Sequence, residues 1–244
     1  MQLDRIQAVV RPRNAWESID LGFSMVRQWW KSLYKLWFIF VLPIFLLVYL
    51  LFYDNWWLPI LIIWWLKPGF DRIILYFLSL ALFDEQPGIQ QTWQALPRFF
   101  KTHLLLALTW WRFDFARSFN LAVWQLEGLK GKKAYQRMKI LQRDTQNVAI
   151  QLTVVCLLFY VMLYLSLFVL VYLMMPTVHI FNFFYIIFEN EWLLKIMSMV
   201  FNLFALSVVE PLYVAGGFAL YLNRRTHLEG WDIELAFRRI ASHY

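Results

Sequence analysis

The amino-acid sequence predicts an all-α integral membrane protein, with about four transmembrane helices in two hairpins and additional amphipathic helices at the membrane surface. Three observations lead to this fold class. The 244 residues are 61% hydrophobic and 16% charged, with a mean hydropathy of +0.52, whereas a soluble domain is about 25% charged. Several apolar stretches approach or exceed the ~20 residues that cross a bilayer. Arg and Lys lie between those stretches, as they do in cytoplasmic loops.

Residues 1–32 are expected to form a cytoplasmic lead-in that contains an amphipathic helix. Asn14 is a suitable N-cap, and Glu17 stands at the spacing of a capping box. A solvated lead-in to the first span fits this pattern. The tryptophans favour a helix that lies in the headgroup layer. Apolar residues recur at steps of three and four and form one stripe: Trp16, Ile19, Phe23, Val26, Trp30 and Leu33.

The first hairpin is assigned to residues 33–66. Residues 33–53 carry no charge except Lys35 and are long enough for one crossing. Pro43 lies within this span and predicts a kink. Residues 56–66 supply about 16 Å of helix, roughly half of the hydrocarbon thickness.

The stretch 56–83 has two interpretations, because Lys67, Pro68 and Gly69 begin a break in its apolar run. One is a short crossing, a turn and a helix on the inner surface. The other is two half-crossings that meet at a broken helix, which requires the irregular backbone to face protein or a cavity. The first interpretation needs no such cavity and is preferred.

Residues 67–147 are expected to be cytoplasmic or interfacial. Within them, residues 84–101 have the pattern of an amphipathic helix. Residues 112–147 form the most basic part of the chain. This part is expected to be a solvated face that attracts anionic lipid headgroups. Gly128 and Gly131 predict a turn within it.

The second hairpin is assigned to residues 148–222. It contains the apolar stretches 149–175 and 193–222, joined by an aromatic connector without Lys or Arg, which fits the outer interface. The basic N-terminal segment, the basic segment 112–147 and the tail 223–244 all belong on the cytoplasmic side. An even number of crossings therefore separates them. Four spans, with both termini in the cytoplasm, is the simplest solution.

Glu210 is the most unusual residue of the last span. On a helix it lies about 21–22 Å from both Lys195 and Arg224, which predicts a position near the middle of the bilayer. A carboxylate without a partner costs several kcal/mol there. We therefore expect Glu210 to be hydrogen-bonded and structural, with Pro211 kinking the helix. A proton or ion site at a broken helix is the alternative.

Two further features belong to the same span. Gly216 and Gly217 are expected to admit a close neighbouring helix. Lys67 and Glu210 both precede a proline, which hints at a duplicated unit. If the bundle brings these two residues together, Lys67 is the expected partner of Glu210.

The charged tail completes the set of candidate residues. Arg225 with Glu229, and Glu234 with Arg238, have the spacing of pairs on a short helix after the membrane exit. The candidates for a structural or functional role are Glu210, Pro211, Lys67, Arg224, Arg225, Glu229, Asp232 and Glu234.

Catalytic and cofactor chemistry is not indicated. The four histidines lack metal-ligand spacing, and no phosphate-binding glycine loop or nucleophile motif is present. Cys156 is the single cysteine, so an intramolecular disulfide is excluded. The basic residues are distributed as membrane loops, which argues against nucleic-acid binding. We expect no enzyme activity, no cofactor and no metal.

Several stretches resemble an uncharacterised family of proteobacterial inner-membrane proteins. The most specific is EPLYVAGGFALYLNRRTHLEGWDIELAFRR at residues 210–239; RPRNAWESIDLGF, LKPGFDR and RSFNLAVWQLEGLKG are also similar. A more distant similarity is to membrane domains found beside glycerophosphodiester phosphodiesterases, whose active site this chain lacks. The resemblance implies a multispan inner-membrane protein, often encoded near a transglutaminase-like membrane protein and an AAA-type ATPase. It implies no catalytic residues.

Two classes of function remain. The first is a non-catalytic inner-membrane subunit or scaffold that engages partner membrane or cytoplasmic proteins. The second is a small transporter or channel component with an intramembrane site at Glu210. A transporter is expected to expose polar residues along several spans, and few are available here, so the scaffold is preferred.

Overall fold

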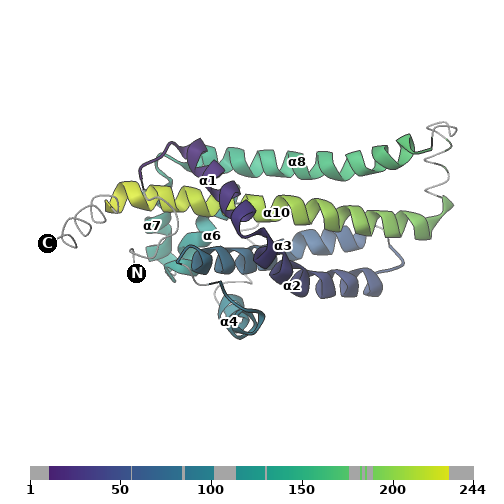
Figure 1. Cartoon of the computed structure of the whole chain (residues 1–244), viewed down its shortest axis with the longest axis horizontal. Helices are drawn as coiled ribbons and strands as arrows, with labels where there is room; N and C mark the ends of the chain where they lie inside the picture. The colour runs from purple at the N-terminus through teal and green to yellow at the C-terminus, as the bar shows by residue number, and fades with distance from the viewer. Residues whose placement is uncertain are drawn as a thin grey trace.

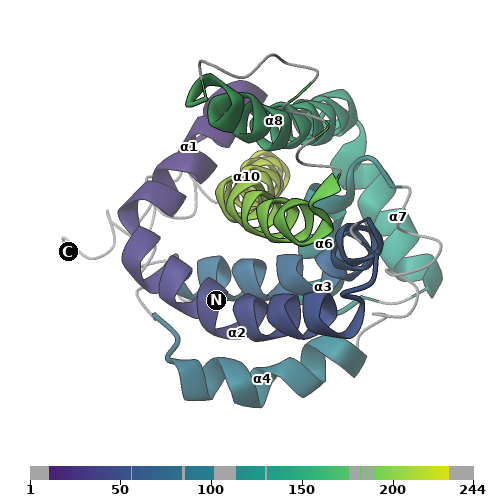
Figure 2. The ribbon, with the colours of Figure 1, turned by 90° about the vertical axis from the view of Figure 1, so that its right-hand side faces the viewer.

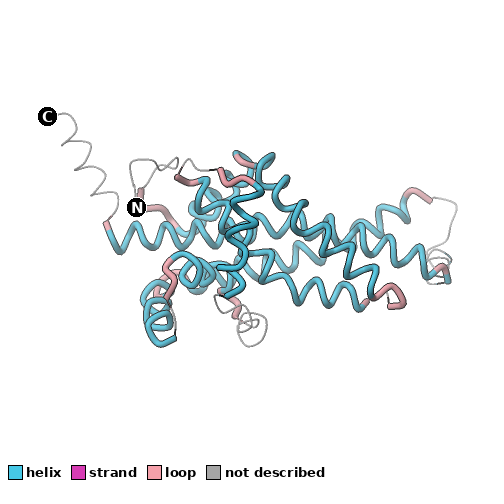
Figure 3. Tube along the Cα trace, turned by 90° about the horizontal axis from the view of Figure 1, so that it is seen from below, coloured by secondary structure: helices cyan, strands magenta, loops and turns pink. Residues whose placement is uncertain are grey.

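The computed structural model describes residues 11–55, 57–83, 86–101, 114–129, 131–175, 182, 185 and 189–230. The regular elements in these ranges are all α-helices (Figure 3), which confirms the all-α fold class. They are α1 (Ala15–Gln28), α2 (Trp30–Leu51), α3 (Leu58–Ala81), α4 (Ile89–Lys101), α6 (Arg117–Leu126), α7 (Gly131–Gln142), α8 (Gln146–Leu173) and α10 (Glu191–Glu229).

Three of these helices, α2, α8 and α10, are long and apolar enough to cross a membrane. α8 is the most exposed, and its outward side chains from Val154 to Leu173 are mostly large and apolar. A soluble protein rarely exposes an apolar surface of that extent. On a membrane helix the same surface contacts acyl chains. The chain therefore has the properties of a membrane protein.

α10 forms the centre of the molecule, with α1, α2, α3, α6 and α8 around it (Figure 2). Glycines let two neighbours reach its backbone. A Cβ on Gly22 of α1 would lie 2.4 Å from the carbonyl oxygen of Ala215, and a Cβ on Gly217 would lie 2.4 Å from the Cβ of Ser118 in α6. The prediction that Gly216 and Gly217 admit close neighbours is confirmed.

α8 and α10 lie side by side and run in opposite directions (Figure 1). Tyr160 donates to Asn202 Oδ1 at 2.7 Å, and Tyr164 and Ser198 share a hydrogen bond of 3.1 Å. Because these two bonds join α8 to α10 one turn apart, they fix the alignment of the pair. Asn202 in turn donates to Tyr49 of α2 at 3.2 Å, so α2 is held at the same level.

α1 and α4 lie across the long axis of the molecule. Figure 1 shows α4 end-on, and Figure 2 shows it lengthwise beneath α2. Trp93 of α4 stacks on Phe40 of α2 with ring centroids 5.8 Å apart. The amphipathic helices predicted near residues 14–33 and 84–101 therefore exist. Their place in a headgroup layer stays a prediction.

The start of the chain differs from the expected single helix in two ways. α1 and α2 are separate helices, because Trp29 between them has a non-helical φ of −108° and ψ of 20°. Asn14 is the N-cap, but its side chain makes no cap hydrogen bond. Glu17 instead pairs with Arg11 and with Arg13, so the predicted capping box is wrong.

The turn predicted between residues 67 and 72 is also wrong. α3 is one continuous helix of 24 residues that passes through Pro68. The proline removes one helical hydrogen bond, and packing of the surrounding helices compensates for it. The half after Pro68 is buried, including Ile74, Leu75 and Leu78. Residues 73–83 therefore belong to the core and do not form a helix on the inner surface.

The basic segment 112–147 is only partly a solvated face. α6 lies inside it, and its residues Arg117 to Trp124 are all buried against neighbouring helices. The density of basic residues in the segment suggested exposure to solvent. In the fold, however, Arg117 and the apolar residues after it are buried in the core together. The predicted turn is confirmed, with positive φ values of 63° at Gly128 and 57° at Gly131.

The last helix is longer than predicted. α10 has 39 residues, so it measures about 58 Å, nearly twice the hydrocarbon thickness. Residues 223–229 continue the same helix and do not start a separate tail helix. The helix ends at Gly230, which adopts the left-handed conformation with φ of 62°. Asp232 and Glu234 lie outside the described residues.

Candidate functional site

Four charged side chains meet where α3, α6 and α10 pack together, and we call them the charge cluster. They are Lys67 and Asp71 of α3, Arg117 of α6 and Glu210 of α10. Lys67 Nζ lies 2.7 Å from Glu210 Oε2, and Arg117 Nη2 lies 2.9 Å from Asp71 Oδ2. The bundle thus brings together the two residues that precede prolines.

Helix geometry explains the composition of the charge cluster. Lys67 and Asp71 are four residues apart, so a continuous α3 presents them on the same face. Arg117 is the first residue of α6, where Asp114 orders the preceding turn. The Asp114 carboxylate accepts hydrogen bonds from the Ala116 amide at 2.9 Å and from Asn120 at 2.5 Å.

The charge cluster is layered, with the carboxylates deepest. The side chains of Glu210 and Asp71 are 0% and 2% exposed, whereas those of Lys67 and Arg117 are 16% and 10% exposed. The formal charges balance, which lowers the cost of burial. Glu210 Oε1, Asp71 Oδ1 and Arg117 Nε nevertheless lack a hydrogen bond within the described part of the chain. Buried polar atoms of this kind usually bind water or an ion.

Tyr213 connects the two cations. Its ring centroid lies 5.3 Å from Lys67 Nζ and 5.7 Å from the Arg117 guanidinium carbon, which are cation–π distances. Its hydroxyl accepts a hydrogen bond from the Ser118 amide at 3.2 Å. Tyr213 is placed one turn after Glu210 on α10, so the same helix face supplies both residues.

A pocket of about 160 Å³ adjoins the charge cluster between α3, α6 and α8. Phe115 and Leu157, which form part of its wall, are among the exposed large apolar residues. The pocket therefore opens on the same surface as the exposed face of α8. Its lining includes Lys67, Arg117, Tyr213, Thr153, Cys156 and Leu157.

The charge cluster lies at one end of the exposed apolar surface. Thr153 of α8 lies 3.4 Å from the Tyr213 hydroxyl, and the exposed apolar run of α8 starts at the next residue, Val154. On the first half of α10, exposed apolar side chains run from Trp192 to Phe204 and end before Glu210. Glu210 is the middle residue of α10, which extends from Glu191 to Glu229. Its depth in a bilayer stays a prediction.

A second polar cluster joins α6, α7 and α10 beyond the charge cluster. Arg137 of α7 pairs with Glu127 at 2.9 Å and with Glu229 at 2.5 Å. Hydrogen bonding to Glu127 raises the pKa of Arg137 above its ordinary value. Arg225 pairs with Glu229 at 2.6 Å, as predicted. These contacts hold α7 against the end of α10.

Arg224 also has a partner in this region. Its guanidinium lies 2.5 Å from the Asp144 carboxylate, in the turn between α7 and α8. Asp144 is 62% exposed, so the pair contributes ~1 kcal/mol or less. Arg224 therefore helps to position this turn beside α10.

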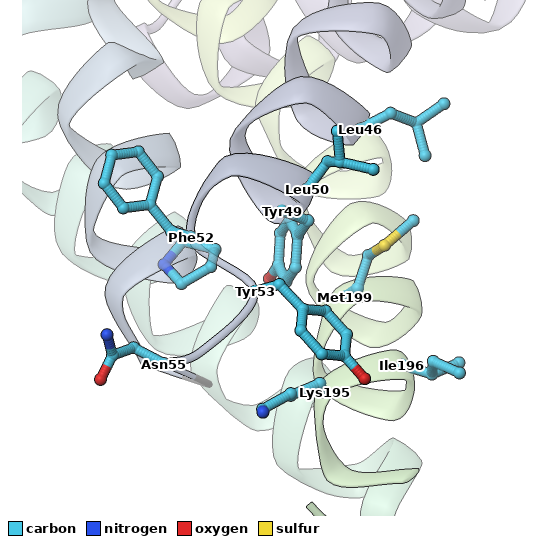
Figure 4. A pocket seen from close by; sticks show the side chains of 10 residues that line it. Leu46, Tyr49, Leu50, Phe52, Tyr53, Asn55, Lys195, Ile196 and Met199 are labelled. Carbon is cyan, nitrogen blue, oxygen red and sulfur yellow. The ribbon is translucent and has the colours of Figure 1, made fainter. Parts of the chain in front are cut away.

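The second pocket, of about 190 Å³, lies between the end of α2 and the start of α10 (Figure 4). Its walls are mostly apolar. Lys195 Nζ lies 4.6 Å from the centroid of the Tyr53 ring and 3.1 Å from Glu191 Oε2. A lysine and aromatic rings thus lie together at the end of the apolar surface that is farther from the charge cluster. Such a combination is common at a membrane interface.

Metal chemistry has no support from the side-chain geometry. In the described ranges, no three His, Cys, Asp or Glu side chains come close enough to hold a metal ion. The charge cluster can fix helices, hold water or transfer a proton. Asp71 and Arg117 were not expected in it, although the four-residue spacing of Lys67 and Asp71 signalled a shared helix face.

Comparisons with protein-family models, with curated proteins and with solved structures found no match to this chain. The resemblance to proteobacterial inner-membrane proteins stays an expectation.

Proposed function

We propose that the protein is a non-catalytic subunit or scaffold of the bacterial inner membrane, and that it engages partner proteins in the membrane or the cytoplasm. One observation carries the proposal: the acidic and basic side chains of α10 from Glu191 to Glu229 have ion-pair partners within the chain. Such pairing supports a fixed arrangement of helices. A transport path requires polar groups that face water along several spans.

The topology that fits this role has four crossings in two hairpins. They are α2, the apolar first half of α3, α8 and the apolar part of α10. Both termini and the basic residues of α7 then face the cytoplasm, where anionic lipid headgroups attract them. α1 and α4, which lie across the bundle, rest in the inner headgroup layer.

Partners are proposed from the family resemblance and the shape of α10. The resemblance implies a transglutaminase-like membrane protein or an AAA-type ATPase as a partner. Because α10 is one helix of 39 residues, it joins the membrane part to the second polar cluster, which holds α7. A partner bound to α7 is thereby held at a set position relative to the bilayer.

A small transporter or channel component is the second candidate. The observation in its favour is the group of buried atoms without hydrogen bonds beside a pocket, namely Glu210 Oε1, Asp71 Oδ1 and Arg117 Nε. Neighbouring carboxyl groups next to an opening are a feature of proton relays. The complete charge balance of the cluster favours the scaffold.

The test is isolation of the chain from cross-linked membranes in a mild detergent. We expect a partner protein in stoichiometric amount, lost when the exposed residues of α7 are changed and retained when exposed residues of α8 are changed. A monomer without a stoichiometric partner, in a deletion strain that is defective in uptake of a solute, would overturn the scaffold in favour of the transporter.

A further inference from the structure

We propose that the pocket beside the charge cluster binds the phosphate group of an anionic membrane phospholipid, with Lys67 and Arg117 holding the phosphate and the apolar wall contacting the acyl chains. The inference requires only that the exposed face of α8 contacts lipid. It is independent of the scaffold role.

The charge layering makes the pocket selective for an anion. The two cations are the more exposed members of the charge cluster and line the pocket, while Glu210 and Asp71 lie behind them at 0% and 2% exposure. Each cation pairs with one carboxylate behind it, Lys67 with Glu210 and Arg117 with Asp71. Lys has three donors and Arg has five, so donors remain for a second anion.

Arg117 has guanidinium donors that its contact with Asp71 does not use. Its side chain lines the pocket and is 10% exposed. Arg binds phosphate with paired, charge-assisted hydrogen bonds, so a phosphate oxygen in the pocket suits these donors.

Asp114 also lines the pocket, and both of its carboxylate oxygens are hydrogen-bonded within the chain. Its two carboxylate oxygens accept hydrogen bonds from the Ala116 amide and from Asn120. These bonds hold the turn that starts α6, and so they position Arg117. The remaining polar wall, Thr153 and Tyr213, is neutral.

The position of the pocket selects a lipid over a soluble phosphate. It opens beside Phe115 and Leu157, which are 58% and 47% exposed, where the exposed apolar run of α8 begins. A phospholipid places its phosphate at this boundary and its acyl chains along the apolar face. Inorganic phosphate gains nothing from the apolar wall.

The experiment uses the full chain in a neutral detergent with a few mole per cent of phosphatidylglycerol, and native mass spectrometry to measure retained lipid. We expect one tightly retained phosphatidylglycerol and weak retention of phosphatidylcholine, whose choline cation meets Lys67 and Arg117. Cys156 lines the pocket, so its labelling by a maleimide reports where the lipid binds. We expect the rate of Cys156 labelling to be several times lower with phosphatidylglycerol than with phosphatidylcholine.

Two variants test the roles of the pocket wall and of Lys67, and a third serves as a control. Leu157→Trp fills the pocket, and Leu158→Trp is its matched control on the outward face of α8. The double variant Lys67→Gln with Glu210→Gln removes one cation while keeping the cluster neutral. We expect lipid affinity to fall about tenfold in Leu157→Trp and in the double variant, and to be unchanged in Leu158→Trp.

Three results would overturn the proposal. Equal retention of phosphatidylglycerol in Leu157→Trp and the unaltered chain places the lipid elsewhere. Equal retention of phosphatidylcholine and phosphatidylglycerol removes the role of the cations. Protection of Cys156 by inorganic phosphate alone, as strong as that by the lipid, identifies a site for soluble phosphate.

Discussion

The ion pair between Lys67 and Glu210 gives the sharpest test of how the helices are held. We consider Lys67→Met, Glu210→Leu and the double variant, which replace the charges by apolar side chains of similar volume. The two residues lie 2.7 Å apart, and only Lys67 has measurable exposure. The variants should therefore have unequal effects on the free energy of unfolding.

Lys67→Met leaves the Glu210 carboxylate without its cation at a position that is 0% exposed. Breaking a buried pair in this way costs about 3–5 kcal/mol. Asp71 lies in the same cluster and adds like-charge repulsion. Glu210→Leu costs less, because Lys67 can still reach the pocket between α3 and α8. In the double variant neither charge remains unpaired, so stability should return close to that of the unaltered chain.

Thermal unfolding of the detergent-solubilised variants measures these differences. A loss of 1 kcal/mol lowers Tm by about 2–4 °C in a chain of this size, so Lys67→Met should lower Tm by roughly 6–20 °C. Small and equal shifts for both single variants, without recovery in the double variant, would refute the conclusion that this pair holds α3 against α10.

Three further predictions concern helix packing, the second polar cluster and membrane topology. Gly22→Ala should destabilise the chain by about 1–3 kcal/mol, because its Cβ meets the α10 backbone at 2.4 Å; Gly69→Ala, which meets nothing within 4 Å, should not lower Tm. Arg137→Ala should cost about 1 kcal/mol or less and should speed hydrogen exchange in α7 but not in α8; uniform acceleration would contradict this. A cysteine at exposed Gln90, in a chain with Cys156 replaced, should resist an impermeant thiol reagent added outside the cell; labelling would contradict the four-crossing topology.

Composition and periodicity predicted the coarse fold because they report directly on burial. The all-α class, the amphipathic helices near α1 and α4, and the apolar stretches of α2, α8 and α10 were all predictable in this way. The close approach at Gly216 and Gly217 followed from the absence of side chains there. The same reasoning anticipated the contact between Lys67 and Glu210, since both precede a proline in an apolar run.

The errors in α3 and α6 share one physical cause, which is that charged residues were taken as signs of solvent. Lys67 and Asp71 were interpreted as a break in α3, and Arg117 as part of a solvated loop. In the folded chain these charges are buried and paired with one another. Pairing between distant segments leaves no local periodic signal, so a single sequence does not reveal it.

Glu210→Gln tests the central claim most directly, because it separates a structural glutamate from a titrating one. The amide keeps the shape of the side chain, and its oxygen can still accept a hydrogen bond from Lys67. Because Lys67 keeps this acceptor and also lines the pocket, the variant should lose much less Tm than Lys67→Met and should complement a deletion strain fully. A variant that keeps its Tm but fails to complement would contradict the structural role and would identify Glu210 as part of a proton- or ion-coupled site.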